Sequence, residues 1–150
     1  MKILIMGLPG SGKTWLAERL QKRLDCAWFN ADKVRDMAND WEFSEAARMR
    51  QAYRMKNIAD YEKENGRMVI CDFVCPLEIT RDVFNADYLI WMDTIKEGRF
   101  NDTNKMFQSP PQKDVNYHVA KWFNDTDEKL VDVIHRYIDI KNKEIIKKHD

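Results

Sequence analysis

A short stretch near the start of the chain limits what it can fold into more than any other feature. It runs Gly7-Leu8-Pro9-Gly10-Ser11-Gly12-Lys13-Thr14 and fits the phosphate-binding pattern G-x-x-x-x-G-K-[ST] at every specified position. An apolar run at 3–6 precedes it and a helical pattern beginning at Trp15 follows it, which is the strand, loop and helix setting that this pattern needs. A chance glycine-rich turn is a poor explanation for a match in that setting. The sequence therefore predicts a nucleoside triphosphate site.

Each part of this loop has a physical role in holding a nucleotide. Glycine lets successive backbone N–H groups wrap a diphosphate at the positive end of the following helix. Lys13 is expected to reach the β- and γ-phosphates, with its ammonium facing solvent in the free protein, and Thr14 to place its hydroxyl on Mg²⁺. ATP and Mg²⁺ are therefore the expected cofactors, bound by the residues from Gly7 to Thr14.

Apolar runs of strand length alternate with helical patterns along the rest of the chain. The expected strands are 3–6, 26–29, 68–71 and 88–92, with a weaker edge strand at 114–119. Helices are expected to begin near Trp15, Ser44, Leu77 and Thr126, and the Lys-rich end at 141–150 is expected to fray. This alternation predicts an α/β fold with three layers and a central parallel sheet of about five strands, in a single domain covering 1–150.

Acidic residues follow two of the apolar runs, at the sheet edge where ligands bind in open α/β folds. Asp72 directly follows 68–71, so Thr14 and Asp72 are the predicted metal ligands; the alternative is that Asp72 only caps the next turn. Asp32 follows 26–29, and its alternative role is the N-cap of a helix that holds Arg35. The segment 94–113 is long and irregular, as functional lids are.

Composition excludes some classes of function. The 25 basic and 25 acidic residues balance, which gives no broad electrostatic case for nucleic acid or an anionic membrane as a partner. The 3 cysteines have no metal-ligand spacing and indicate reduced thiols. No apolar run approaches ~18 residues, and the first run begins too early for a signal peptide. We therefore expect a soluble, cytoplasmic protein with no membrane partner.

Four stretches together resemble a known family. They are the phosphate loop followed by WLAERL, then Asn30-Ala31-Asp32-Lys33-Val34-Arg35, Glu42-Phe43-Ser44-Glu45-Ala46-Ala47-Arg48 and Phe73-Val74-Cys75-Pro76. In these stretches the chain is similar to the adenylylsulfate kinases, P-loop kinases that transfer the γ-phosphoryl of ATP to the 3′-hydroxyl of adenosine 5′-phosphosulfate. The resemblance covers residues 1 to about 93 and fades in the lid.

The resemblance implies roles for particular residues. Asp32 is similar to the family's acid near the acceptor hydroxyl, which accepts its proton or holds Mg²⁺ through water. Arg35 and Arg48 are similar to its substrate-anion arginines, whose paired N–H groups suit a phosphosulfate. For Arg35 the alternative is a solvated helix charge. The other expected acceptor contacts are Phe43 and Phe73, together with Gln51, which stands further along the helix where the family has an asparagine.

The chain also departs from the family pattern. Asn30 stands where the family has the first acid of its pair, and the family's arginine-aspartate-proline-lysine run is missing from the lid. By position alone, Arg99 or Lys105 could cover the transferring phosphoryl and Phe107 could stack on a purine. The predicted catalytic residues are therefore Lys13, Asp32 and Arg99.

Two other functions compete with a small adenylylsulfate kinase. The loop, helix, strand and Asp32-x-x-Arg35 order also resembles polynucleotide kinases, which phosphorylate a 5′-hydroxyl, and other nucleotide kinases remain open. Nucleic acid is an expected partner only if the chain is a polynucleotide kinase, and its neutral charge disfavours that function. A binding module that switches without transferring phosphate is the third function, and it would need no acceptor pocket.

Overall fold

Five parallel strands form the central sheet of the computed structural model, which describes residues 1–149. The strands are β1 (Lys2–Met6), β2 (Ala27–Asn30), β3 (Val69–Asp72), β4 (Tyr88–Met92) and β5 (Tyr117–Val119). They lie in the order β2-β3-β1-β4-β5, and each neighbouring pair is parallel. The predicted sheet is confirmed, including the position of the last strand at an edge.

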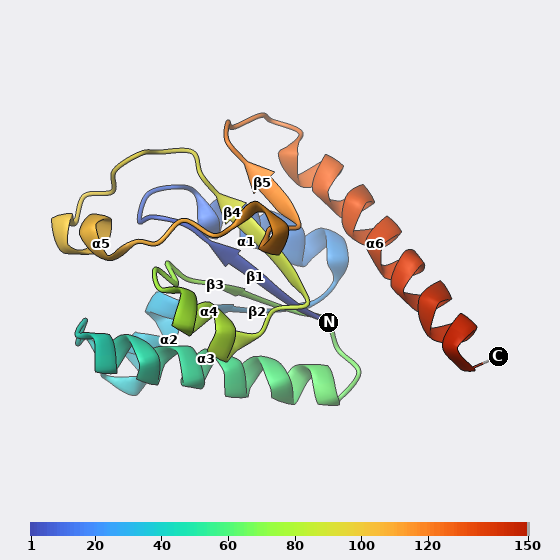
Figure 1. The fold of residues 1–150 in the computed structure, drawn as a ribbon, viewed down its shortest axis with the longest axis horizontal. Coiled ribbons are helices and arrows are strands. Elements are labelled where there is room, and N and C mark those ends of the chain that lie inside the picture. The colour runs from blue at the N-terminus through green and yellow to red at the C-terminus, as the bar shows by residue number, and fades with distance from the viewer. Residues whose placement is uncertain (150) are drawn as a thin grey trace.

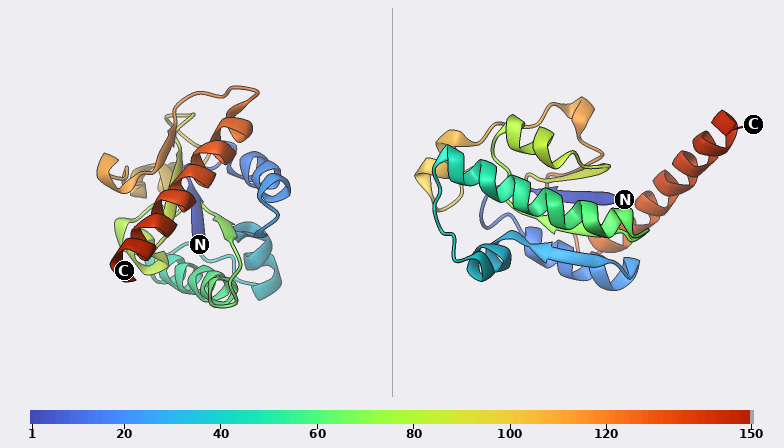
Figure 2. Two further views of the ribbon diagram at one scale, coloured as in Figure 1. Left: turned by 90° about the vertical axis from the view of Figure 1, so that its right-hand side faces the viewer. Right: turned by 90° about the horizontal axis from the view of Figure 1, so that it is seen from below.

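Helices cover both faces of this sheet (Figures 1 and 2). They are α1 (Lys13–Leu24), α2 (Ala31–Ala38), α3 (Glu45–Glu64), α4 (Glu78–Phe84), α5 (Asn101–Met106) and α6 (Thr126–His149), with a short 3₁₀ turn η1 (Gln112–Asp114). Successive side chains of a strand point to opposite faces. Ile3 and Ile5 of β1 therefore pack with α1 and α6, whereas Leu4 and Met6 pack with α2, α3 and α4. This double burial explains why the strands read as continuous apolar runs.

The start of α2 differs from the expectation. Strand β2 extends through Asn30, and the Asn30 side chain accepts a hydrogen bond of 3.0 Å from the backbone N–H of Lys33. Asn30 is therefore the N-cap of α2, and the alternative role of Asp32 as that cap is wrong. Asp32 lies instead in the first turn of the helix with its side chain exposed.

Two later segments, 94–113 and 141–149, contain more helix than the sequence predicted. The segment 94–113 is irregular as predicted but contains α5 and most of η1. The residues expected to fray continue α6 as far as His149, because the stretch has no glycine or proline to stop it, and Asp150 lies outside the described residues. This end of α6 projects from the body of the molecule (Figure 2). Between residues 1 and 149, no helix is both long and apolar enough to cross a membrane.

Candidate active site

The phosphate loop lies between β1 and α1, and two of its glycines are required by close contacts. A Cβ at Gly7 would lie 2.5 Å from the Met92 carbonyl oxygen at the end of β4. Gly12 has φ +98°, and a Cβ there would overlap the ring of Trp122, which comes from the loop after β5. The loop is therefore fixed from two sides of the molecule. Trp122 gave no sequence signal of this role.

Lys13 begins α1 and its side chain lines the cavity described below. Its Nζ donates a hydrogen bond of 3.0 Å to the Leu8 carbonyl, so the ammonium folds back over its own loop. Burial lowers the pKa of Lys13 from 10.5 to about 8, against the opposing effect of the Asp72 and Asp32 carboxylates. The side chain is half-buried at the edge of the cavity, so the ammonium rests on its own loop and is not fully solvent-facing as expected.

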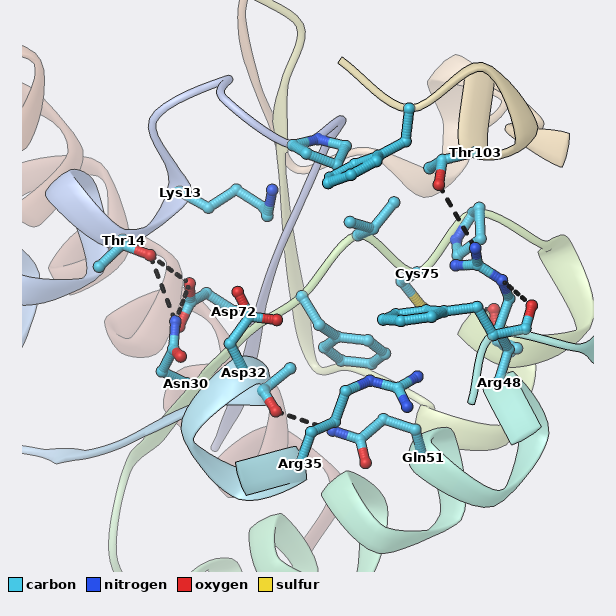
Figure 3. A pocket seen from close by; sticks show the side chains of 18 of the residues that line it. Lys13, Thr14, Asn30, Asp32, Arg35, Arg48, Gln51, Asp72, Cys75 and Thr103 are labelled. Carbon is cyan, nitrogen blue, oxygen red and sulfur yellow. Dashed lines mark hydrogen bonds between the residues drawn. The ribbon is translucent and has the colours of Figure 1, made fainter. Parts of the chain in front are cut away.

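Thr14 and Asp72 face each other as predicted (Figure 3). The Thr14 hydroxyl donates to Asp72 Oδ2 at 3.2 Å, and Asn30 Nδ2 donates to Thr14 Oγ1 at 3.2 Å and to Asp72 Oδ2 at 3.1 Å. Trp28 Nε1 donates to Asp72 Oδ1 at 2.6 Å. The pKa of Asp72 is raised overall, because burial raises it more than these hydrogen bonds lower it. Asp72 is thus turned toward the phosphate loop and away from the turn that follows β3.

The donor set around Thr14 fits a magnesium ion that arrives with a nucleotide. A hydroxyl and a carboxylate supply the oxygen ligands that Mg²⁺ prefers, and Mg²⁺ usually binds through one or two carboxylates together with substrate phosphates. Within residues 1–149, no group of three or more His, Cys, Asp or Glu side chains gathers to form an all-protein metal site. Thr14 and Asp72 are therefore the residues suited to hold the ion.

A cavity of about 430 Å³ opens beside the loop at the carboxyl ends of the strands. Lys13 lies on one wall and the paired arginines Arg35 and Arg48 lie on the other, with Asp32 pointing into the space between them (Figure 3). The predicted site residues that line the cavity are Pro9, Gly10, Lys13, Thr14, Asp32, Arg35, Phe43, Arg48, Gln51, Asp72 and Phe73. The structure thus brings together residues from four separate stretches of the sequence.

Arg35 and Arg48 lie against the same aromatic ring. The Arg35 and Arg48 guanidinium carbons are 4.7 Å and 5.4 Å from the centre of the Phe43 ring. Both arginine side chains are buried, and burial lowers the pKa of each. The alternative role of Arg35 as a solvated helix charge is therefore wrong. Two buried cations and an aromatic ring make this wall suited to a ligand with an anion and a flat ring.

Backbone carbonyls aim these arginines. Arg35 Nη1 donates to the carbonyls of Asp40 at 3.1 Å and Glu42 at 2.9 Å, in the loop between α2 and α3. The Asp40 carboxylate in turn accepts from Arg50 at 2.7 Å and from Arg54 at 3.0 Å, and these guanidinium groups hold the pKa of Asp40 well below its usual range. Asp40 is therefore the anchor of this loop. The sequence showed only an acid among polar residues.

Gln51 lies on the cavity wall but its amide is already used. Its Nε2 donates to the Ala31 carbonyl at 3.0 Å, and its Oε1 accepts from Arg54. Gln51 therefore ties α3 to the first residue of α2, next to Asp32. Gln51 was predicted to contact the acceptor, but its hydrogen bonds support the position of Asp32 instead.

The segment 94–113 reaches the cavity through residues that sequence reasoning missed. Phe100, Asp102 and Thr103 line the cavity, and Thr103 Oγ1 accepts from Arg48 Nη2 at 3.3 Å. Arg99 and Phe107 do not lie on it. The Arg99 guanidinium lies 5.3 Å from the centre of the Phe100 ring. Phe107 packs against the hydrophobic cluster that contains Leu4 and Met6 of β1.

Phe107 lies beside a hydrogen bond that joins its segment to the chain after β3. The chain turns back after α5, and the backbone N–H of Gln108 donates to the Pro76 carbonyl at 2.7 Å. Phe107, the preceding residue, packs against the core, whereas Phe100 is exposed at the cavity. Spacing within an irregular segment carries no periodic signal that could have distinguished the two aromatic residues.

Residues 3–105 match the family model described as an AAA domain. This span contains the phosphate loop, Asp32, both cavity arginines and Asp72. The chain belongs to this family. Among curated relatives of this AAA-family chain, the "Probable adenylyl-sulfate kinase" of Aeropyrum pernix is 33% identical over 90 residues, which cover 54% of the chain and 48% of the relative.

Two further comparisons define the likeness. The "Bifunctional enzyme NodQ" of Azospirillum brasilense is 31% identical over 86 residues, which cover 53% of the chain and 14% of that protein. The match thus spans less than half the length of either curated relative. The APS kinase CysC of Mycobacterium tuberculosis, solved with AMPPNP and APS, has a TM-score of 0.71 at 18% identity, covering 89% of this chain and 96% of that one.

These findings confirm two predictions from the sequence. The three-layer P-loop kinase fold with its parallel sheet is confirmed by the strand order and the structural match. The resemblance of the AAA-family chain to the adenylylsulfate kinases is confirmed by the curated relative, and the solved structures show that the fold is shared.

Proposed function

We propose that this chain is an ATP-dependent kinase that phosphorylates the 3′-hydroxyl of adenosine 5′-phosphosulfate. The observation that carries the proposal is one cavity with two unlike walls. The phosphate loop and Lys13 form the donor wall, and the stack of Arg35, Phe43 and Arg48 forms the acceptor wall. Asp32 lies between them, where an acceptor hydroxyl would meet a phosphoryl group.

The donor wall holds the triphosphate in this proposal. Backbone N–H groups of the loop and the N-terminus of α1 bind the phosphates, and Lys13 exchanges its hydrogen bond to the Leu8 carbonyl for phosphate oxygens. Thr14 and Asp72 would hold the Mg²⁺ that accompanies ATP. When bound, this ion would supply positive charge that offsets the negative charge of the phosphates.

The acceptor wall positions adenosine 5′-phosphosulfate. Arg35 and Arg48 bind its anionic end, and the exposed rings of Phe43 and Phe100 contact the adenine. Asp32 accepts the proton of the 3′-hydroxyl while the 3′-oxygen of the acceptor forms a bond to the γ-phosphorus. The bond between that phosphorus and the β–γ bridging oxygen breaks, and ADP leaves.

The fold alone does not identify the acceptor, because a solved sugar kinase and a solved gluconokinase share the fold. A 5′-hydroxyl polynucleotide kinase is less well supported, because the chain carries no net positive charge to attract a nucleic acid backbone. A binding module without transfer is disfavoured by the gathering of Asp32, Arg35 and Arg48 on one cavity, which such a module would not need.

The acceptor can be tested in one experiment. The chain would be given Mg-ATP with adenosine 5′-phosphosulfate, a 5′-hydroxyl oligonucleotide, nucleoside monophosphates or gluconate, and the products would be measured by mass spectrometry. We expect phosphate to appear on the 3′-oxygen of adenosine 5′-phosphosulfate. Transfer to another of these acceptors alone would overturn the choice of acceptor, and the absence of ADP and of any product would support the binding module.

Arg48→Lys should weaken the acceptor much more than ATP. Lysine keeps the positive charge but cannot form two parallel hydrogen bonds to paired oxygens, and it loses the bonds to the Phe43 carbonyl and Thr103. We expect the KM for the acceptor to rise about tenfold to a hundredfold, the effect of losing one charge-assisted hydrogen bond. Steady-state kinetics with each substrate varied in turn measures this. The matched control is Arg136→Lys, at an exposed position of α6. Equal losses for both substrates in the Arg48 variant would place Arg48 outside the acceptor site.

ATP affinity should fall as the pH rises through about 8. Lys13 has a pKa of about 8 in the free protein, and bound phosphates favour its charged form, so binding above that pH must take up a proton. We expect the affinity to fall about tenfold between pH 7 and pH 9 by calorimetry. The Lys13→Met variant should lack this step. A flat profile for the wild type between these values would show that Lys13 is not the group that titrates.

A further inference from the structure

Asp72 receives its shortest hydrogen bond from a residue that the proposed mechanism has not used. The Trp28 indole Nε1 donates to Asp72 Oδ1 at 2.6 Å, compared with 3.1 to 3.3 Å for the bonds from Thr14 and Asn30. Strand pairing explains the meeting. Asn30 of β2 lies opposite Asp72 of β3, and Trp28, two residues earlier on β2, points to the same face of the sheet.

The two oxygens of this carboxylate have different partners. Oδ1 accepts from Trp28, and Oδ2 accepts from the Thr14 hydroxyl, while Asn30 donates to both. Rotation of the carboxylate would break the short bond to the indole, so Oδ2 is kept beside Thr14. The Thr14 hydroxyl donates a hydrogen bond to Oδ2, so the lone pairs of the Thr14 oxygen are left to accept from Asn30 and to bind a cation.

An indole suits this position for two physical reasons. Its N–H is only a donor and carries no charge, so it holds the acid without the repulsion that a lysine or arginine would exert on Mg²⁺. Its ring is half-buried and packs against the hydrophobic cluster that includes Ile3 and Leu16. The donor is therefore held in place by packing, as groups that orient metal ligands usually are.

We infer that Trp28 is a positioning residue that fixes the orientation of Asp72 and thereby strengthens the binding of magnesium-bearing nucleotide. The inference rests on the proposed function in one respect, the use of Thr14 and Asp72 for Mg²⁺. It concerns the metal side of the donor site and is independent of which acceptor the chain phosphorylates.

The experiment removes only the indole N–H. Trp28 would be replaced by benzothienylalanine, in which sulfur takes the place of the N–H, and in a second variant by phenylalanine. Calorimetry would measure the dissociation constant of ATP with Mg²⁺ and again with EDTA, and the ratio of the two constants gives the metal enhancement. Trp91→Phe is the matched control, because Trp91 is a buried tryptophan on the opposite face of the sheet that stacks on His118.

We expect both Trp28 variants to lose about tenfold in metal enhancement, with unchanged ATP affinity in EDTA and an unchanged midpoint of thermal unfolding for the benzothienylalanine protein. The Trp91 control should keep the wild-type ratio. A wild-type ratio in the benzothienylalanine protein would overturn the inference, as would equal losses with and without metal, which indicate general damage to the loop. Failure of the wild type to bind ATP in either buffer would instead overturn the proposed function itself.

Discussion

Replacement of Asp32 by asparagine is expected to lower turnover by about two to four orders of magnitude, the usual contribution of a general base. The side chain keeps its size and its place in the first turn of α2 but loses the negative charge that accepts the proton. ATP affinity should change by less than about tenfold, because Asp32 faces the acceptor and contacts no phosphate in the proposed arrangement. Steady-state kinetics combined with calorimetry separates the two effects.

Stability provides the internal control for this variant. Asn30, not Asp32, caps α2, so Asp32→Asn removes only a favourable charge near the helix N-terminus, worth about 0.5 kcal/mol. Asp36→Asn is the matched variant, since Asp36 lies on the same helix, is exposed and does not line the cavity. Wild-type turnover by the Asp32 variant would remove this residue from the catalytic machinery.

Lys13→Met is expected to reduce transfer by about three orders of magnitude or more, because the ammonium neutralises charge on the transferring phosphoryl group at a preorganised position. Methionine is a fair replacement in shape, since it keeps most of the length of the side chain in the cavity wall. The measurement is single-turnover formation of ADP at saturating ATP. Substantial turnover by the variant would show that Lys13 is not part of the donor site.

The same substitution should make the free protein more stable. The folded-state pKa of Lys13, about 8, lies below the ordinary 10.5 of an unfolded lysine, so the folded state binds fewer protons between these values. Stability therefore rises with pH from about 8 to about 10.5, and below pH 8 the buried charge costs up to about 3 kcal/mol. Methionine removes that cost, and denaturant unfolding at pH 7 should show it. Lys22→Met, at an exposed site on α1, should show no comparable gain.

Local spacing in the sequence determined the sheet, four of its six α-helices and the residues assigned to the donor half of the site. The phosphate loop is contiguous, and under the proposed function it binds phosphates largely through its own backbone. Asp72 could be assigned to Thr14 before the structure was known, because parallel strands end at one edge of the sheet and the carboxylate directly follows such a strand. Arg35 and Arg48 were placed on the acceptor side through the family resemblance, whose motifs are also local.

Only the tertiary structure decided which side chains aim and support that site. The hydrogen bonds from Trp28 to Asp72 and from Arg48 to Thr103 join residues 44 and 55 positions apart, and the packing of Trp122 on Gly12 joins the loop after β5 to the phosphate loop. In the segment 94–113, Phe100 reaches the cavity and Phe107 packs against the core. Such contacts depend on how helices and loops dock across the sheet. Periodicity and motif spacing describe a single segment, so they carry no information about which distant segment will lie against it.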